Sequence, residues 1–181
     1  MGLTKPRLTE EEFLRLPDNG RKYELVNGEA KEVPTKFLHD MIGIIIISYL
    51  MAAGARESGG LTSGQAGFRM ANGNIRCPDV SFTRTERLPG GKVPNDFGNA
   101  APDFCVEIIS PSEDMADQSR KLAEYFDSGA SVVWHVFPET RSIAVFTSPS
   151  NKALHGTGHI LDIGDLLPGF SCPVDDLFAT D

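Results

Sequence analysis

The sequence predicts an α/β domain, and this prediction depends on three stretches of the chain. Residues 103–109 form a near-continuous apolar run, which is typical of a central strand buried on both faces. A helical pattern follows them, and a second apolar strand covers 131–137. Earlier in the chain, residues 41–55 are apolar with helical spacing. Strands and helices in this arrangement indicate a sheet covered by helices.

Length and composition favour one domain over residues 1–181. The chain is long enough for a single well-filled core, which we expect over about 8–170, followed by an acidic C-terminal tail. The three cysteines form no CxxC pair and no apolar leader opens the chain, so we expect a reduced, cytoplasmic protein. Residues 41–55 fall short of the roughly 18 residues that a membrane span needs.

The charge of the chain is negative overall but unevenly distributed. A net charge of −8 disfavours broad electrostatic binding to nucleic acid or to anionic membranes. Residues 69–92 nevertheless carry a local balance of +3, whereas 159–181 contain acidic residues and no Lys or Arg. This asymmetry indicates that a polyanion, if one binds, binds near the middle of the chain.

The N-terminal part is expected to contain a short helix and a β-hairpin. Thr9 and Glu12 have the spacing of a capping box, which predicts a helix over 10–16. Asn27-Gly28 is the strongest turn signal in the sequence and predicts a type I′ hairpin between strands over 23–26 and 29–33.

The helix predicted over 41–55 has one clear apolar face. Its members, spaced three and four residues apart, are Ile42, Ile45, Ile46, Tyr49 and Leu50. Because Ile44 and Ile47 fill other faces, we expect cover on more than one side, in part from the partner subunit of a homodimer. Two strands, over 61–70 and 75–83, are then expected to pair as a hairpin, and 84–101 to form a long surface loop.

The central strand is expected to lead directly into a helix. Ser110, Pro111 and Glu113 fit the N-cap, N1 and N3 positions of a helix that runs to about Ser128. Strands over 131–137 and 142–147 follow. Beyond these strands we expect only a weaker hairpin and an irregular acidic tail.

Glu107 is an acid inside the central apolar run. Burying a carboxylate costs several kcal/mol unless it is paired or binds a metal. Strand parity places Glu107 on one face of its strand, and Asp79 on one face of the strand over 75–83. If these strands are neighbours, the two carboxylates converge and form an oxygen-rich site suited to Mg²⁺ or Mn²⁺.

Lys121 and Glu24 are further charged candidates. Lys121 falls about two turns into the predicted helix, where its ammonium could stabilise negative charge beside a metal or phosphate. The alternative is a surface ion pair with Asp117 at i−4. Glu24 interrupts the first hairpin strand, and it either joins the acidic cluster or occupies the wet face of the hairpin.

Four motifs occur in order along the chain: YELVNGE at 23–29, PDVSF at 78–82, PDFCVEIISPS at 102–112, and Lys121-Leu122 with Tyr125. Together they resemble the Uma-type restriction endonuclease family of the PD-(D/E)XK nuclease superfamily. The resemblance extends from about Leu8 to Phe170. It implies a restriction-endonuclease-like α/β fold, in which helices flank a mixed central sheet.

The resemblance also implies an active site. Asp79 and Glu107 would bind Mg²⁺ or Mn²⁺, and Lys121 would assist catalysis. The superfamily usually places its lysine two residues after the glutamate, where this chain has Ile109. The matching residue is then Lys121, relocated to the following helix. Phe137 stands where the family often has an aspartate, and we assign it no role.

The remaining candidates would contact substrate. A histidine often occupies the position of His39 in the family, which implies a role beside the substrate, with a helix cap as the alternative. Four arginines are expected to contact the DNA backbone without reading sequence: Arg69, Arg76, Arg84 and Arg87. Cys105 and His135 could form a thiol nucleophile and base, for which an inert buried cysteine is the competing interpretation.

These observations favour a Mg²⁺-dependent endonuclease that hydrolyses DNA, with Glu24 completing the acidic cluster. The alternative is a non-catalytic module that keeps the nuclease fold and binds nucleic acid or protein. The absent strand lysine and the net acidity of the chain leave room for that alternative.

Overall fold

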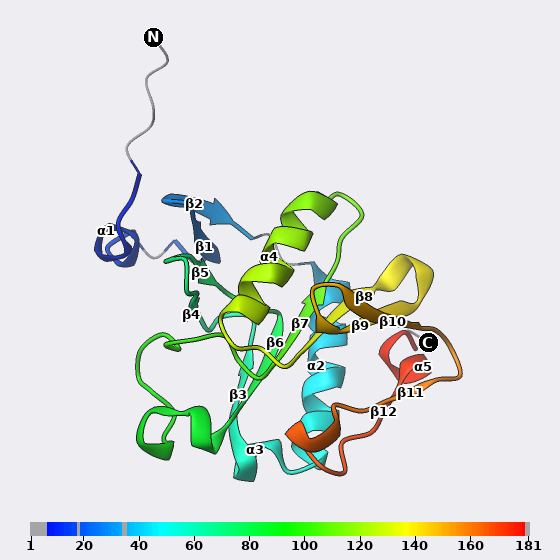
Figure 1. Cartoon of the computed structure of the whole chain (residues 1–181). Coiled ribbons are helices and arrows are strands. Elements are labelled where there is room, and N and C mark those ends of the chain that lie inside the picture. The colour runs from blue at the N-terminus through cyan, green and yellow to red at the C-terminus, as the bar shows by residue number, and fades with distance from the viewer. Residues whose placement is uncertain (1–6, 18, 34–35, 180–181) are drawn as a thin grey trace.

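A six-stranded mixed sheet forms the centre of the molecule in the computed structural model, which describes residues 7–17, 19–33 and 36–179 (Figure 1). The strand order is β10-β9-β8-β7-β6-β3. The bounds are β3 Gly59–Ser63, β6 Val80–Arg84, β7 Phe104–Ile108, β8 Val132–Phe137, β9 Ser142–Ser148 and β10 Asn151–His155. Only β7 and β8 run parallel, because helix α4 (Met115–Asp127) connects them as a crossover. The predicted mixed sheet is confirmed.

A second sheet of four short strands lies beside the first, in the order β2-β1-β5-β4. Its strands are β1 Tyr23–Val26, β2 Glu29–Glu32, β4 Phe68–Arg69 and β5 Ile75–Arg76. Asn27 and Gly28, with φ of 52° and 80°, join β1 to β2. Both φ angles are positive, so the predicted type I′ hairpin is confirmed. A two-stranded sheet, β11 (Ile160–Leu161) with β12 (Cys172–Pro173), completes the strands.

Helices cover both faces of the six-stranded sheet. The helices are α1 Glu10–Leu14, α2 Phe37–Ala52, α3 Ala55–Ser58, α4 and α5 Val174–Leu177. Val106 of β7 packs in one apolar cluster with α2, whereas its neighbour Cys105 packs in another with Leu122 and Tyr125 of α4. Successive residues of β7 therefore face α2 and α4 in turn, as strand parity predicts. The capping box of Thr9 and Glu12 is confirmed at α1.

Helix α2 is longer at its start than predicted and is covered on one side. Ile42 and Ile46 are fully buried against the sheet. In contrast, Ile44 is 65% exposed and Phe37 is 85% exposed. The described part of the chain therefore does not provide the second cover, and a partner subunit stays a prediction. Within the described residues, no helix combines the length and apolar character that a membrane span requires.

The strands predicted over 61–70 and 75–83 are each divided between the two sheets, which corrects the prediction. β3 and β6 belong to the large sheet, whereas β4 and β5 belong to the small one. The strand predicted over 75–83 is interrupted at Pro78-Asp79, between β5 and β6. Proline has no N–H to donate, so it interrupts the ladder where the chain passes between sheets. As a result Asp79 precedes β6 instead of lying within a strand.

Helix α4 begins four residues later than predicted. Its N-cap is Asp114, whose side chain accepts a hydrogen bond from the Ala116 N–H. Only the Glu113 half of the expected capping box forms, because the Ser110 N–H donates to Glu113 Oε1 at 2.9 Å, whereas the Glu113 N–H donates to the backbone carbonyl of Ser110 at 3.0 Å instead of to its hydroxyl. These bonds close a separate turn that ends before the helix starts.

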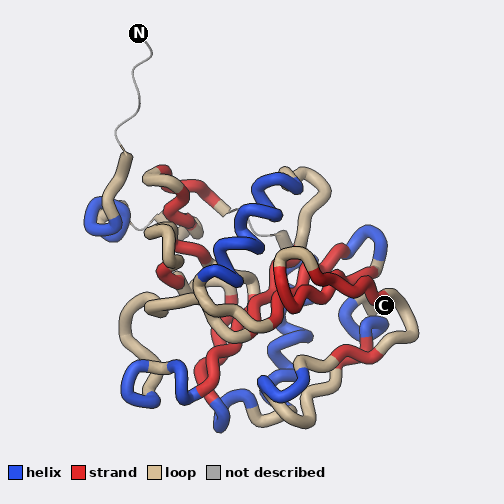
Figure 2. Tube along the Cα trace, viewed as in Figure 1, coloured by secondary structure: helices blue, strands red, loops and turns tan. Residues whose placement is uncertain are grey.

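The segment after Ser148 contributes more buried residues to the core than the sequence predicted. Leu161, Cys172 and Leu177 are buried in the cluster that contains α2, so this segment is part of the core. Their spacing matches neither a helix nor a strand, and the sequence pattern missed them for that reason. Residues 180 and 181 of the predicted acidic tail lie outside the described residues. The loop over 84–101 contains two short 3₁₀ turns, Thr85–Arg87 and Pro89–Gly91 (Figure 2).

Candidate active site

Asp79, directly before β6, lies beside Glu107 of the neighbouring strand β7. The register sets Val80 opposite Val106, and the Asp79 N–H donates to the Val106 carbonyl at 2.9 Å. The pairing therefore continues one residue beyond β6. The Asp79 carboxylate accepts a hydrogen bond from the Ile108 N–H at 2.8 Å, next to Glu107. The structure thus brings together the two carboxylates that strand parity and the motifs predict.

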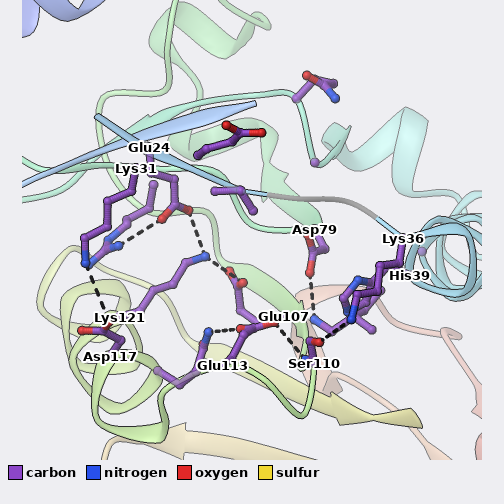
Figure 3. Close-up of a pocket in the computed structure, with 18 of the residues that line it drawn as sticks. Glu24, Lys31, Lys36, His39, Asp79, Glu107, Ser110, Glu113, Asp117 and Lys121 are labelled. Carbon is purple, nitrogen blue, oxygen red and sulfur yellow. Dashed lines mark hydrogen bonds and ion pairs between the residues drawn. The ribbon is translucent and has the colours of Figure 1, made fainter. Parts of the chain in front are cut away.

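Lys121 enters the same site from α4 (Figure 3). Its Nζ lies 2.7 Å from Glu107 Oε2 and 2.9 Å from Glu24 Oε1. The Lys121 side chain is 8% exposed and each glutamate side chain 6%. The alternative pairing with Asp117 is absent among the described ion pairs, because Asp117 binds Arg120 and Lys31 instead. Lys121 belongs to the buried face of α4.

Tyr125 is a site residue to which the sequence assigned no role. Its hydroxyl donates to Glu107 Oε1 at 2.5 Å, while Lys121 binds the other oxygen. Lys121 and Tyr125 are one helical turn apart on the buried face of α4, so one helix holds both oxygens of Glu107. The spacing in the sequence allowed this contact, but nothing in the sequence identified Glu107 as the partner.

Glu24 is held by a buried network of charges. It accepts hydrogen bonds from the Cys77 N–H at 2.9 Å and from Arg76 at 3.0 Å. Arg76 also donates to Glu124 of α4 at 2.6 Å. Arg76, which the sequence assigned to the DNA backbone, is thus paired with two carboxylates inside the protein. Its position joins the small sheet to α4 and fixes Glu24 beside Lys121.

The buried charges perturb one another. Burial raises the pKa of Glu107 to about 7, against the opposing charge of Lys121 and with the support of Asp79 and Glu24. Burial also acts to raise the pKa of Glu24, but Lys121 and Arg76 outweigh it and lower that pKa to about 2. Burial alone would lower the pKa of Lys121, yet Glu107 and Glu24 raise it above its ordinary value. Lys121 is therefore an ammonium.

A cavity of about 630 Å³ opens onto this site. Six of the predicted site residues line it: Glu24, His39, Arg76, Asp79, Glu107 and Lys121. The other three arginines do not. Arg69 is bound by Glu10 at 2.8 Å and Asp96 at 3.0 Å, and Arg84 and Arg87 both bind Asp103 before the start of β7. The structure therefore does not bring these three arginines to the candidate site.

Lys22 is a further residue that the sequence did not indicate. Its Nζ lies 3.4 Å from Asp79 Oδ1, and its side chain is buried. Lys22 and Asp79 are 57 positions apart in the chain, so no local pattern could connect them. Cys105, in contrast, is enclosed in the core, and burial raises the pKa of its thiol well above the ordinary value. The cysteine-nucleophile interpretation finds no support in this environment.

The donor set fits a hard divalent cation. Within residues 7–17, 19–33 and 36–179, no group of three or more His, Cys, Asp or Glu side chains is arranged around a common metal position. Two facing carboxylates are nevertheless what Mg²⁺ commonly takes from a protein, since water and substrate phosphate supply its other ligands. Burial raises the pKa of Glu107 despite the nearby Lys121, so a cation beside this carboxyl group would favour its charged form.

Comparisons with known proteins concern the family and the fold of the chain. The family model Uma2, described as "Putative restriction endonuclease", matches residues 10–175. The fold is similar to a crystal structure from Anabaena variabilis, described as a "putative nuclease belonging to DUF820", with a TM-score of 0.82 and 19% sequence identity over 94% of this chain and 97% of that chain. At that identity the likeness concerns the fold alone. A comparison with curated proteins gives no match.

Proposed function

The chain belongs to the Uma2 family, described as "Putative restriction endonuclease", and we propose that it hydrolyses phosphodiester bonds of DNA with a divalent metal ion, Mg²⁺ or Mn²⁺. Asp79 and Glu107 would hold the ion. When bound, the ion supplies Lewis-acid stabilisation of charge at the phosphoryl group, chemistry that no side chain of the site provides. In the net reaction water adds to phosphorus and a sugar oxygen leaves.

The observation that carries this proposal is the position of Lys121. Its ammonium lies 2.7 Å from Glu107, in a site that also contains Asp79, and it comes from α4 instead of from β7. Ile109, at the usual position of the superfamily lysine, is buried and apolar. An ammonium beside Glu107 can orient the attacking water and stabilise the negative charge that develops on the phosphate.

Glu24 would act by positioning Lys121. Its carboxylate binds the ammonium at 2.9 Å from the side opposite Glu107, and Arg76 and the Cys77 N–H fix it in turn. Holding the ammonium between two carboxylates restricts its freedom before substrate binds. Preorganised charge of this kind stabilises a transition state without reorganisation during the reaction.

A second function is favoured by one feature of the site. Lys121 already pairs with Glu24 and Glu107, and Tyr125 already donates to Glu107. The network could therefore be purely structural in a module that binds nucleic acid or protein without cleaving it. The two functions differ in their response to metal. Divalent cations should raise the melting temperature of the nuclease, and Glu107→Gln should abolish that rise; a binding module need not show either effect.

Hydrolysis of plasmid and single-stranded DNA in Mg²⁺ or Mn²⁺ tests the proposed activity. Asp79→Asn and Glu107→Gln keep the size of each side chain and remove its charge, so they are the matched controls. We expect wild-type cleavage to exceed that of both variants by at least about 100-fold. Cleavage that is equal in all three proteins would indicate a contaminating nuclease and count against the proposal.

We also propose a homodimer formed through the exposed side of α2. Phe37, Ile44 and Met51 recur at seven-residue spacing, and each is at least half exposed. An apolar stripe of this kind on a surface helix often contacts another protein. Light scattering after size exclusion should give twice the chain mass for wild type and the chain mass for Ile44→Glu. A monomeric wild-type protein would contradict the dimer and leave the proposed activity intact.

A further inference from the structure

The cavity extends past Asp79 and Glu107 to a second group of polar side chains at the start of α2. This group consists of Lys36, His39, Ser110 and Ser112, and all four residues line the cavity. Figure 3 shows Lys36, His39 and Ser110 gathered on one side of the two carboxylates, while Lys121 and Lys31 lie on the other side.

The second group is held together by its own hydrogen bonds. Lys36 Nζ lies 2.9 Å from Ser110 Oγ, and Ser110 Oγ lies 3.2 Å from Ser112 Oγ. Ser110 is buried, and its backbone is fixed by the turn that Glu113 closes. An ammonium and two hydroxyls therefore converge on one point of the cavity wall, at the end of β7.

Lys36 differs from the other cations of the cavity because no carboxylate among the described residues pairs with it. Lys31, Arg76, Arg120 and Lys121 each form an ion pair within the protein. Among the described ion pairs none includes Lys36, whose ammonium donates a hydrogen bond to the neutral hydroxyl of Ser110. Since an ammonium has three N–H donors, Lys36 can donate to a ligand while it keeps that hydrogen bond.

We propose that Lys36, His39, Ser110 and Ser112 form a subsite for a backbone phosphate that neighbours the scissile one. An unpaired ammonium, flanked by hydroxyls and an imidazole, matches the hydrogen-bond acceptors and the charge of a phosphate group. The proposal rests on the proposed nuclease function and narrows its substrate to a polynucleotide, because a small phosphodiester has no second phosphate for this subsite.

The position of the subsite separates it from the catalytic carboxylates. Ser110 follows Glu107 by three residues, and at about 3.3 Å per residue this corresponds to about 10 Å along the strand direction. A strand of DNA that places one phosphate at Asp79 and Glu107 can place another at Lys36, and the subsite thereby fixes the direction in which the strand crosses the site.

Binding of single-stranded DNA by Lys36→Met tests the subsite. The measurement uses the full chain in a Glu107→Gln background, which removes cleavage, and follows the dissociation constant of a short oligonucleotide as salt concentration rises. We expect Lys36→Met to weaken binding about 10-fold. The slope of log affinity against log salt should fall by about 0.7, the value for one lost contact to a single-stranded phosphate.

Two controls show that this effect is local. Lys92 is an exposed lysine outside the cavity, and Lys92→Met should leave the salt slope unchanged. Hydrolysis of bis(p-nitrophenyl) phosphate, which has no second phosphate, should be equal in wild type and in Lys36→Met with Glu107 intact. Ser110→Ala should weaken binding of the oligonucleotide less than Lys36→Met, since the ammonium remains.

The possible failures are distinguishable. If the parent protein binds DNA and Lys36→Met has the same affinity and salt slope as Lys92→Met, the subsite is wrong and the nuclease proposal stands. If Lys36→Met slows hydrolysis of the small diester as much as cleavage of DNA, Lys36 acts on the catalytic centre and the subsite is again wrong. If the Glu107→Gln protein does not bind DNA and the wild-type protein does not cleave it, both proposals are wrong.

Discussion

Replacing Lys121 by methionine should destabilise the protein far more than an ordinary lysine substitution. Methionine has a similar length but no charge, so it leaves Glu24 and Glu107 facing each other without the ammonium between them. Removing one partner from a buried ion pair costs about 3–5 kcal/mol. The free energy of unfolding of a whole domain is only about 5–15 kcal/mol, so this loss is a large fraction of the total.

Urea denaturation measures this loss directly. Trp134 is the single tryptophan of the chain and is fully buried, so its fluorescence reports global unfolding. For a slope of about 2 kcal/mol per M urea, a loss of 3–5 kcal/mol lowers the midpoint by about 2 M. The matched control is Lys92→Met, the same substitution at an exposed position, which should change the free energy by less than about 0.5 kcal/mol.

A double substitution separates the charge effect from packing. In Lys121→Met/Glu107→Gln the buried carboxylate of Glu107 is neutral, so part of the lost stability should return, by at least about 1 kcal/mol. Equal losses in Lys121→Met and Lys92→Met would show that the ammonium contributes nothing in the buried site. That result would contradict a stabilising ammonium held between Glu24 and Glu107.

Three further predictions concern single contacts. Glu24, with a pKa lowered to about 2, stabilises the fold above about pH 4.5 and loses this contribution as the pH falls toward 2. The difference in unfolding free energy between wild type and Glu24→Gln should therefore shrink over that range. A constant difference would be evidence against the ion pair with Lys121. Tyr125→Phe should lower the free energy of unfolding in urea by about 1.5–3 kcal/mol, because it removes the hydroxyl that donates to Glu107. Tyr49→Phe removes a surface hydrogen bond and should lower it by less than about 1 kcal/mol. Similar losses in both variants would contradict the buried contact. Gly28→Ala should lower the free energy of unfolding by at least about 1 kcal/mol, because Gly28 has a φ of +80° and an added Cβ would approach Arg7 Cβ to 2.5 Å. Gly156→Ala, where an added Cβ meets no atom within 4 Å, should lower it less. The reverse order in thermal unfolding would contradict the type I′ turn.

The sequence could predict those parts of the fold that have a local cause. The turn at Asn27-Gly28, the capping box of Thr9 and the buried strand around Glu107 each follow from neighbouring residues. The predicted start of α4 was wrong, although one of the expected bonds, from the Ser110 N–H to the Glu113 side chain, forms. Two local patterns compete there, and the side chain of Asp114, which caps Ala116, determines where the helix begins.

The candidate site could be predicted only in part, for a related reason. Glu107 can be identified as a candidate site residue because it is an acid in an apolar run, and that signal is local. The contacts of Glu24 with Arg76 and of Lys22 with Asp79 join segments more than 50 positions apart, so no spacing in the sequence indicates them. Arg69, Arg84 and Arg87 are basic like Arg76, and only the fold reveals that they bind carboxylates outside the cavity.

We propose that Asp79 and Glu107 together bind a divalent metal beside the Lys121 ammonium. The most direct test is a crystal structure of the protein with Mn²⁺, recorded with anomalous diffraction that locates the metal. We expect one anomalous peak in contact with both carboxylates, with Lys121 Nζ nearby, and no such peak in Glu107→Gln crystals at the same Mn²⁺ concentration. A wild-type structure at saturating Mn²⁺ with no peak between Asp79 and Glu107 would contradict the account.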